Sequence, residues 1–386
     1  MPSQSHFLSN KRPRTTSQPP ATPHGTDHLS SLPLDMQHEI LRRLPLEGAV
    51  RTSALNKPWS RRWAQCPGLE LAFVDEDPPA AVDSVLATYA FHTISVFQLC
   101  VAIESRGRVE GWLRSLAAKG VKSLILHFDI TRGLDFPALP SQIFQCCALT
   151  SLELRFCHIP PMPPSFLGFT NLEQLMLDSV RFHKQHGEKT FEALISRSTS
   201  LTTLAVLYPT IDDSDGEDGQ NEEWVLRSPK VEVLDIRSAD DYAWVFGDLP
   251  IIKKGFVELE GPHLVKILSG MTRVKELHIV ILHEDDEITE VVGMEFLHAQ
   301  QNAGLFSRLT YVRLDGIIGQ LNEMHFIEFV LLKAAQLKKL EVSVDEDSSM
   351  SVEMVSSELA TYKRACPHAE VIINHFNGYS EETDDE

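Results

Sequence analysis

Residues 149–159 read LTSLELRFCHI, and this stretch decides the fold of the chain. It follows the pattern LxxLxLxx(N/C)xL, in which Leu152 and Leu154 alternate with the polar Glu153 and Arg155. Because successive side chains of a strand point to opposite faces, the alternation predicts a short strand with leucines on one face and polar residues on the other. A single copy of a short pattern is weak evidence, and its weight depends on how often it recurs.

The apolar core of this pattern recurs, with aliphatic substitutions, along most of the chain. The further copies are Phe91-Ile94-Val96, Val121-Leu124-Leu126, Leu172-Leu175-Leu177, Leu201-Leu204-Val206, Val231-Leu234-Ile236, Val274-Leu277-Ile279, Leu309-Val312-Leu314, Leu337-Leu340-Val342 and a poorer one, Lys254-Val257-Leu259. The mean spacing of about 27 residues is typical of leucine-rich repeats. The sequence therefore predicts an α/β fold, a curved leucine-rich-repeat solenoid. Its strands would form a concave parallel sheet, and segments such as 188–196 and 324–335 would form convex helices.

A compact helical unit is expected over residues 27–70. Met36, Ile40, Leu41 and Leu44 recur at helical spacing, Pro45 ends that helix, and two further short helical segments follow. Three helices in so short a unit carry more apolar surface than they can bury alone, so the unit should pack on a neighbouring part of the chain or on a partner. Its core is expected to be separate from that of the repeats.

The remaining segments complete the organisation. Residues 1–26 are polar and Pro-rich, which predicts a disordered tail; its basic cluster at 11–14 is either a nuclear address or a chance cluster. The repeats occupy 71–315. Residues 316–376 form a C-terminal cap with two helices and an apolar strand at 371–373. Residues 377–386 form an acidic tail.

Charge and composition restrict the function. The formal net charge is −19, and the acidic segments 212–223 and 380–386 contribute twelve of the negative charges. The rest is only mildly acidic, so we expect no nucleic-acid partner. Segment 212–223 is expected to be a solvated insertion in which Ser214 is a candidate phosphorylation site, and capture of a basic target is the alternative. The N-terminus lacks a secretory signal and no apolar run is long enough to span a membrane.

Catalytic and metal-binding motifs are missing from the sequence. The six cysteines form no CxxC pair, no His cluster completes a zinc site, and there is no GxSxG, HExxH, GxxxxGK(S/T) or GxGxxG. We therefore expect reduced thiols, no cofactor, no metal and no enzymatic activity. The expected location is the nucleus, the cytoplasm or both.

The N-terminal unit resembles the F-box, in the version that opens plant F-box/LRR proteins. The residues that carry the resemblance are the leucine-proline pair at 32–33, the Ile-Leu-x-x-Leu-Pro run at 40–45 and the turn with Trp59 and Trp63. Asn56 and Pro58 depart from the family, which more often has Ser or Cys and Arg or Lys there. Residues 331–342, LLKAAQLKKLEV, look like part of the FBD region that ends many of these proteins, so the cap at 316–376 is FBD-like.

The resemblance implies a substrate-recognition adaptor of a Skp–cullin–F-box ubiquitin ligase. The F-box would dock on a Skp-type linker that leads to a cullin and a RING protein, while the solenoid would hold a target protein and bring its lysine near the ubiquitin thioester. The alternatives are a ligase-independent scaffold and a small-ligand receptor. Candidate linker contacts are Leu32, Pro33, Ile40, Leu41, Leu44, Pro45, Val50, Leu55 and Trp59. Trp59 and Trp63 are equally compatible with packing on the first repeats.

Target contacts are expected from the variable concave positions of the strands. The candidates are Glu153, Arg155, Met176, Asp178, Asp235, Arg237, His278, Arg313, Asp315 and Glu341. Each position taken alone fits a solvated strand residue better than a target contact. As a set they carry mixed charge, which favours a protein target of mixed charge over a polyanion.

Overall fold

The computed structural model describes residues 28–74, 77–130, 136–212, 224–238, 245–247, 249–259, 268, 270–281, 305–346 and 348–376. The predicted N-terminal tail, nearly all of the acidic segment 212–223 and the C-terminal tail lie outside these residues.

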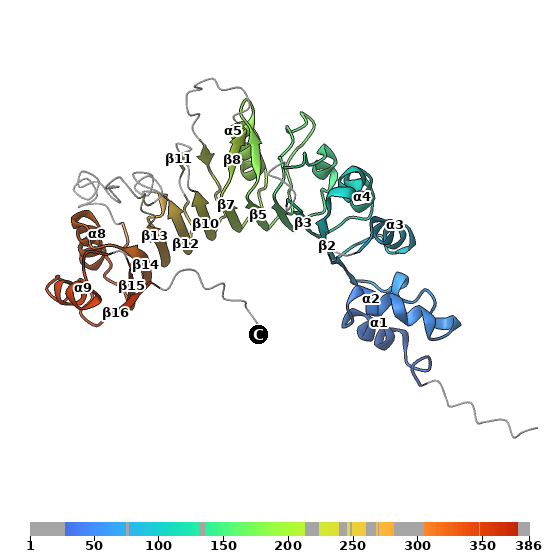
Figure 1. The fold of residues 1–386 in the computed structure, drawn as a ribbon, viewed down its shortest axis with the longest axis horizontal. Coiled ribbons are helices and arrows are strands. Elements are labelled where there is room, and N and C mark those ends of the chain that lie inside the picture. The colour runs from blue at the N-terminus through green and yellow to red at the C-terminus, as the bar shows by residue number, and fades with distance from the viewer. Residues whose placement is uncertain are drawn as a thin grey trace, which may run out of the picture.

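One parallel sheet of 12 strands runs through the molecule. Its strands follow one another in chain order and curve into an arc, with the helices on the outer side (Figure 1). They are β1 (Glu70–Phe73), β2 (Val96–Val101), β3 (Ser123–Phe128), β4 (Ser151–Arg155), β5 (Gln174–Asp178), β7 (Thr203–Leu207), β10 (Val233–Ser238), β12 (Lys254–Leu259), β13 (Glu276–Ile281), β14 (Tyr311–Ile317), β15 (Lys339–Val344) and β16 (Glu370–His375).

The register of the sheet stacks the repeat leucines on one another. Leu152 of β4 pairs with Leu124 of β3 and Leu175 of β5, and Leu204 continues the row into β7. All four side chains are at most 2% exposed. Because each repeat leaves its leucines against those of the next, the core is continuous along the arc, and no repeat buries its apolar face alone.

Two of the predicted repeats are out of register. In the first, Phe97 pairs with Leu124, so the apolar triplet is Ile94-Phe97-Leu99 and Phe91 is exposed. In the poor copy, Gly255 pairs with Leu234, so the triplet is Ile252-Gly255-Val257. A Cβ at Gly255 would lie 3.0 Å from the Met271 sulfur. Met271 therefore fills the volume that a leucine occupies in the other repeats.

The segments that connect the strands form the outer layer. Its helices are α3 (Pro79–Thr88), α4 (Val109–Ala118), α5 (Gly187–Ser196), α8 (Leu321–Lys333) and α9 (Val352–Leu359), with 3-10 turns at Ile103–Arg108 and Ser141–Gln145. In α4 the residues Val109, Trp112, Leu113 and Leu116 recur at helical spacing and are buried. The helices expected near 188–196 and 324–335 are confirmed as α5 and α8.

The chain leaves several strands through the same turn. Phe156, Ser179 and Tyr208 directly follow β4, β5 and β7, and all have positive φ. Each backbone N–H donates to the carbonyl at the end of the next strand, at 2.7–3.2 Å. Gly316 has the corresponding position in β14, where a Cβ would lie 2.4 Å from the carbonyl oxygen of Ile281. This turn directs the chain out of the sheet and over its rim.

A second, shorter ladder forms at the rim. β6 (Arg181–His183) pairs in parallel with β8 (Thr210–Asp212), and His158 bridges Ala138 and Arg181. Further along, β9 (Val225–Leu226) pairs with β11 (Val245–Phe246). Phe182 of β6 is fully buried against Phe191 of α5 and Trp224. The rim ladder is thus packed firmly on the outer layer.

The N-terminal unit holds two α-helices followed by 3-10 turns. These are α1 (Leu34–Arg42), α2 (Leu46–Arg51), and the turns Thr52–Ala54, Lys57–Trp59 and Trp63–Gln65. The expected third helix is therefore a series of single turns. Pro58 is compatible only with the first turn of a helix, and Asn56 caps that turn by accepting a hydrogen bond from the Trp59 N–H at 3.1 Å.

The unit and the repeats share one continuous hydrophobic core, so the expectation of separate cores was wrong. The Tyr89 hydroxyl donates to the Cys66 carbonyl at 2.8 Å, and the Ala90 N–H donates to the Ala64 carbonyl at 2.9 Å. Tyr89 follows α3 and is fully buried. Burial and hydrogen bonding together join the N-terminal unit to the first repeats.

Candidate partner-binding surfaces

Four apolar side chains of the N-terminal unit face solvent. Leu29, Leu34, Met36 and Leu55 are 44%, 48%, 54% and 57% exposed. We call these four residues the docking patch. The segments of Leu29 and Leu55 are held together because the Asn56 side-chain amide donates to the Ser30 hydroxyl at 3.0 Å. Several large exposed apolar side chains on so small a unit are typical of a protein-binding surface.

The predicted linker contacts divide into three groups in the structure. Pro33, Pro45 and Leu55 are exposed, while Leu32, Ile40, Leu44 and Val50 are half-buried. Leu41 and Trp59 are 0% and 2% exposed, so they support the surface from inside and do not form it. The indole N–H of Trp59 donates to the Ser30 hydroxyl at 3.0 Å, which fixes the Trp59 ring inside the unit. Trp63 is buried as well.

Sequence reasoning missed part of the docking patch because it assigned the wrong phase to α1. It placed Met36 on one apolar stripe with Ile40, Leu41 and Leu44, whereas the buried residues of α1 are Gln37, His38 and Leu41. The Gln37 amide donates to the Leu32 carbonyl at 2.9 Å, which makes its burial possible. This phase leaves Met36 on the outer face, whereas Leu34 lies in line with Gln37, His38 and Leu41 but is exposed at the first residue of the helix. No pattern in the sequence signals that a glutamine takes the inward position.

His38 makes the N-terminal unit sensitive to acid. Burial lowers the pKa of His38, Arg62 and Arg42 lower it further, and Asp35 opposes them. Within the described residues its buried Nε2 has no hydrogen-bond partner. The unfolded chain, with a pKa of about 6.5 at this group, then binds a proton that the folded chain refuses. The contribution of neutral His38 to the free energy of unfolding is therefore complete above about pH 6.5. It is lost as the pH drops towards the pKa of the folded state.

We expect the melting temperature of the wild-type chain to fall more steeply between about pH 8 and pH 5 than that of His38→Gln. The control is His92→Gln, which removes an exposed imidazole. Thermal melts recorded across this range measure the effect. Equal slopes for wild type and His38→Gln would show that His38 does not link proton binding to folding.

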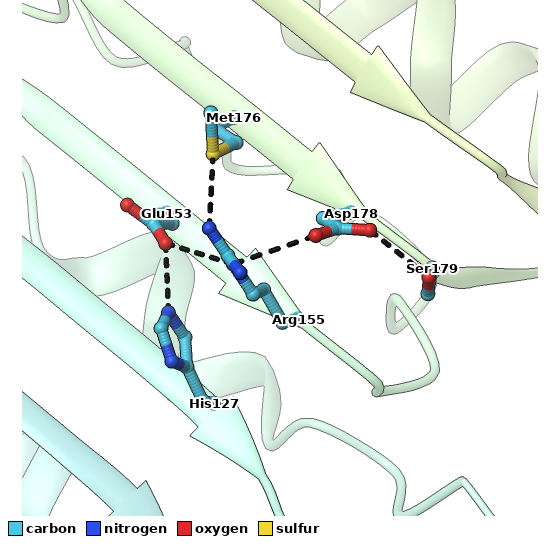
Figure 2. A network of polar contacts seen from close by, with 6 residues as sticks. All are labelled: His127, Glu153, Arg155, Met176, Asp178 and Ser179. Atoms are coloured by element: carbon cyan, nitrogen blue, oxygen red, sulfur yellow. Dashed lines mark hydrogen bonds and ion pairs between the residues drawn. The ribbon is translucent and has the colours of Figure 1, made fainter. Parts of the chain in front are cut away.

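The concave face carries a polar network across β3, β4 and β5 (Figure 2). His127 Nε2 lies 2.7 Å from Glu153 Oε1, and Arg155 Nε donates to the same oxygen at 2.9 Å. Arg155 also lies 3.5 Å from Asp178, and its guanidinium reaches the Met176 sulfur at 3.9 Å. The hydrogen bond to His127 lowers the pKa of Glu153, and the charge of Arg155 adds to the effect against burial.

A second concave network spans β10 to β14. Arg237 pairs with Asp235 at 3.0 Å and stacks over the Phe256 ring at 4.2 Å. The Phe256 ring lies 4.4 Å from that of His278, and His278 Nε2 lies 2.7 Å from Asp315.

The carboxyl groups of this second network differ in their titration. Burial acts to raise the pKa of Asp315, but hydrogen bonds from His278, Ser343 and Arg313 outweigh it and the pKa is lowered. At Asp235 burial wins over Arg237, and the pKa is raised.

All ten predicted target contacts lie on concave strands, and most are paired with one another. Arg313 bonds Asp315 at 2.8 Å, and the Tyr311 hydroxyl donates to Glu341 at 2.6 Å. Sequence reasoning did not select His127, Tyr208, Phe256 and Tyr311, although all but Tyr208 occupy the same alternating strand positions. Their mutual pairing fixes these side chains before a partner arrives, which lowers the entropy cost of binding.

A small helical unit with an apolar docking patch, joined to a curved array of leucine-rich strands, is the arrangement expected of an F-box followed by leucine-rich repeats. The comparisons with known families agree. The F-box domain matches residues 29–69, and the family described as FBD-associated F-box protein At5g56370, LRR repeats, matches residues 109–215.

Curated relatives from Arabidopsis thaliana are named for the same domains. F-box/FBD/LRR-repeat protein At1g13570 is 24% identical, over 90% of this chain and 98% of its own length. F-box/FBD/LRR-repeat protein At2g04230 is 28% identical over 67% of this chain and 63% of its own length. F-box/LRR-repeat protein At5g02910 is 23% identical over 66% and 60%. The chain thus carries an F-box and leucine-rich repeats, and it is similar to plant F-box/LRR proteins of the FBD type.

None of the helices in the described residues is long and apolar enough to cross a membrane. In the same part of the chain, no group of three or more His, Cys, Asp or Glu side chains is arranged to hold a metal ion.

Proposed function

We propose that the chain is the substrate-recognition subunit of a Skp–cullin–F-box ubiquitin ligase. The observation that carries the proposal is the docking patch, four exposed apolar side chains on the unit that matches the F-box domain. Burying these side chains against a Skp-type linker would stabilise the complex by roughly 25 cal/mol per Å² of apolar surface. The linker would in turn bring a cullin and a RING protein.

The chain itself supplies no reactive group in this mechanism. It raises the effective concentration of a target lysine near the ubiquitin thioester, so that a bimolecular transfer becomes effectively intramolecular. The shared core between the N-terminal unit and the first repeats supports this role. A stiff connection keeps the held target at a fixed position relative to the linker.

The concave face is the surface that we assign to the target. Its cations and carboxylates are paired along the strands and partly buried, as in the networks at Arg155 and Arg313. Such a surface selects a protein of matching mixed charge, because a wrong partner leaves desolvated charges unpaired. We place the complex in the nucleus or the cytoplasm.

Target capture tests the assignment. A chain with Leu34→Asp and Met36→Asp should retain its targets without passing them to the ligase, which suits it as a trap. Deleting the whole F-box would instead expose core residues of the first repeats, because the two units share one core. When Arg155→Gln is introduced into this trap, target recovery should fall by roughly ten-fold. The substitution removes the guanidinium that pairs with Glu153 and Asp178.

The control in the trap is Arg114→Gln, which removes an exposed guanidinium from α4 on the outer layer. Quantitative mass spectrometry of the captured proteins compares the two variants. Equal recovery of targets with Arg155→Gln and with Arg114→Gln would show that the target does not bind the concave face.

A further inference from the structure

A cationic surface on the rim differs in kind from the concave face. On the concave face Arg155, Arg237 and Arg313 all have carboxylate partners. On the rim, Arg181 begins β6 and its guanidinium lies over the Phe136 ring, 4.1 Å from the centroid. Within the described residues, no carboxylate lies within ion-pair distance of Arg181, although the residue is half-buried. A cation that stacks on an aromatic face keeps its N–H edge available to an anion.

Two neighbouring chain segments extend this surface onto the outer layer. The Ile159 N–H donates to the Arg181 carbonyl at 2.8 Å, so the segment 158–164 begins beside β6. Beyond β6 the rings of His183 and His186 are stacked 5.6 Å apart, and α5 follows. In Figure 1, α5 lies on the outer side of the arc, away from the inner edge formed by β5 and β7.

A groove of about 320 Å³ lies between these two segments. One wall holds Met162, Pro163 and Pro164, and the other holds His186, Lys189 and Arg197. Arg197 is fixed in place because it donates to the Phe166 carbonyl at 2.6 Å and approaches the Met162 sulfur at 3.7 Å. None of the residues that line the groove is acidic. Lys189 pairs with Glu188 at 3.5 Å, but its side chain is 76% exposed, so the pair is weak and the charge stays accessible.

We propose that this groove binds an acidic peptide segment of a partner protein. Carboxylate or phosphate groups would contact Arg181 at the rim and Lys189 and Arg197 beside the groove, and an apolar side chain would lie against Met162 and the two prolines. An apolar wall opposite a cationic wall suits an amphipathic peptide, and the volume is in the range of sites that hold a few side chains. A long nucleic acid is disfavoured, because the chain carries a net charge of −19.

The proposed groove is independent of the docking patch and of the concave face. Neither wall contains a residue of β4 or β5, and the groove lies on the outer layer. The partner that it binds is therefore compatible with a target held on the concave face at the same time. Failure of the groove proposal leaves the ligase role standing.

Peptide binding by the full-length chain tests the proposal. The probe is a fluorescein-labelled 12-residue peptide of alternating Glu and Pro with one central Leu. Its binding is measured by fluorescence anisotropy at low salt. Two further arms use the same peptide with phosphoserine at two Glu positions and with Lys at every Glu position. We expect the two anionic peptides to bind with a micromolar Kd. The Lys peptide should bind at least ten-fold more weakly.

Arg181→Gln with Lys189→Gln should weaken the anionic peptides by at least ten-fold. The matched control, Arg114→Gln with Lys363→Gln, removes the same charge from exposed positions outside the groove. Hydrogen exchange should show protection at 181–197 on peptide binding, and thermal melts report whether each variant folds. Equal weakening by both double variants, absence of binding to the wild-type chain, or equal affinity for a single-stranded RNA of the same charge would overturn the proposal.

Discussion

Replacing Leu34 and Met36 with aspartate should abolish binding to a Skp-type linker while the chain stays folded. Both side chains are about half exposed in the free chain, so the substitutions cost little stability. In the complex they would bury two carboxylates without partners, which costs several kcal/mol and weakens binding by roughly a hundred-fold or more. Titration calorimetry with purified linker measures the affinity, and thermal melts report on folding.

The control for this experiment makes the same chemical change elsewhere. Leu167 and Leu321 are 84% and 72% exposed and lie outside the N-terminal unit. Leu167→Asp with Leu321→Asp should therefore bind the linker as the wild-type chain does. A linker that binds the docking-patch variant and this control equally well would show that the docking patch has been assigned to the wrong surface.

Leu152→Asp should unfold the repeat array. Leu152 is 2% exposed and pairs with Leu124 on one side and Leu175 on the other, so a carboxylate there has no access to water or to a cation. An unpaired buried carboxylate costs several kcal/mol, which is a large part of the stability of a folded domain. Because each repeat depends on its neighbours, the damage should spread along the array.

Ser151→Asp is the matched control for Leu152→Asp. Ser151 is the neighbouring residue of β4 and is half-buried on the polar face of the strand. We expect an insoluble or non-cooperatively melting Leu152→Asp chain beside a Ser151→Asp chain that melts like wild type. A soluble Leu152→Asp chain with a wild-type melting curve would contradict the register of the sheet.

The repeat pattern predicts the strands because the alternation of leucine and polar residues is a local property of the chain. It fails where the inward position is filled from a distance. At Gly255 the sulfur of Met271, sixteen residues later, takes the volume of the missing leucine. In the first repeat, Phe91 matches the pattern, but the pairing of Phe97 with Leu124 sets the register instead. Neither choice is visible in the local sequence.

The binding surfaces were predictable to different degrees. The concave residues follow from strand alternation alone, which is why Glu153 and Arg155 could be chosen, but the 2.7 Å contact from Glu153 to His127 joins separate repeats. The docking patch was only partly predicted because buried Gln37 changes the phase of α1. The groove between residues 161–164 and α5 depends on the turns after β4 and β5. These turns bring His158 and Ile159, which lead into the groove, beside β6.

Complex formation with a purified Skp-type linker and cullin tests the central claim most directly. The three proteins are mixed at micromolar concentration and separated by size-exclusion chromatography, with the Leu34→Asp, Met36→Asp chain run in parallel. The ligase role predicts that the wild-type chain elutes with linker and cullin as one complex of equal stoichiometry, and that the variant elutes alone. A wild-type chain that elutes apart from both proteins would contradict the assignment as a ligase subunit.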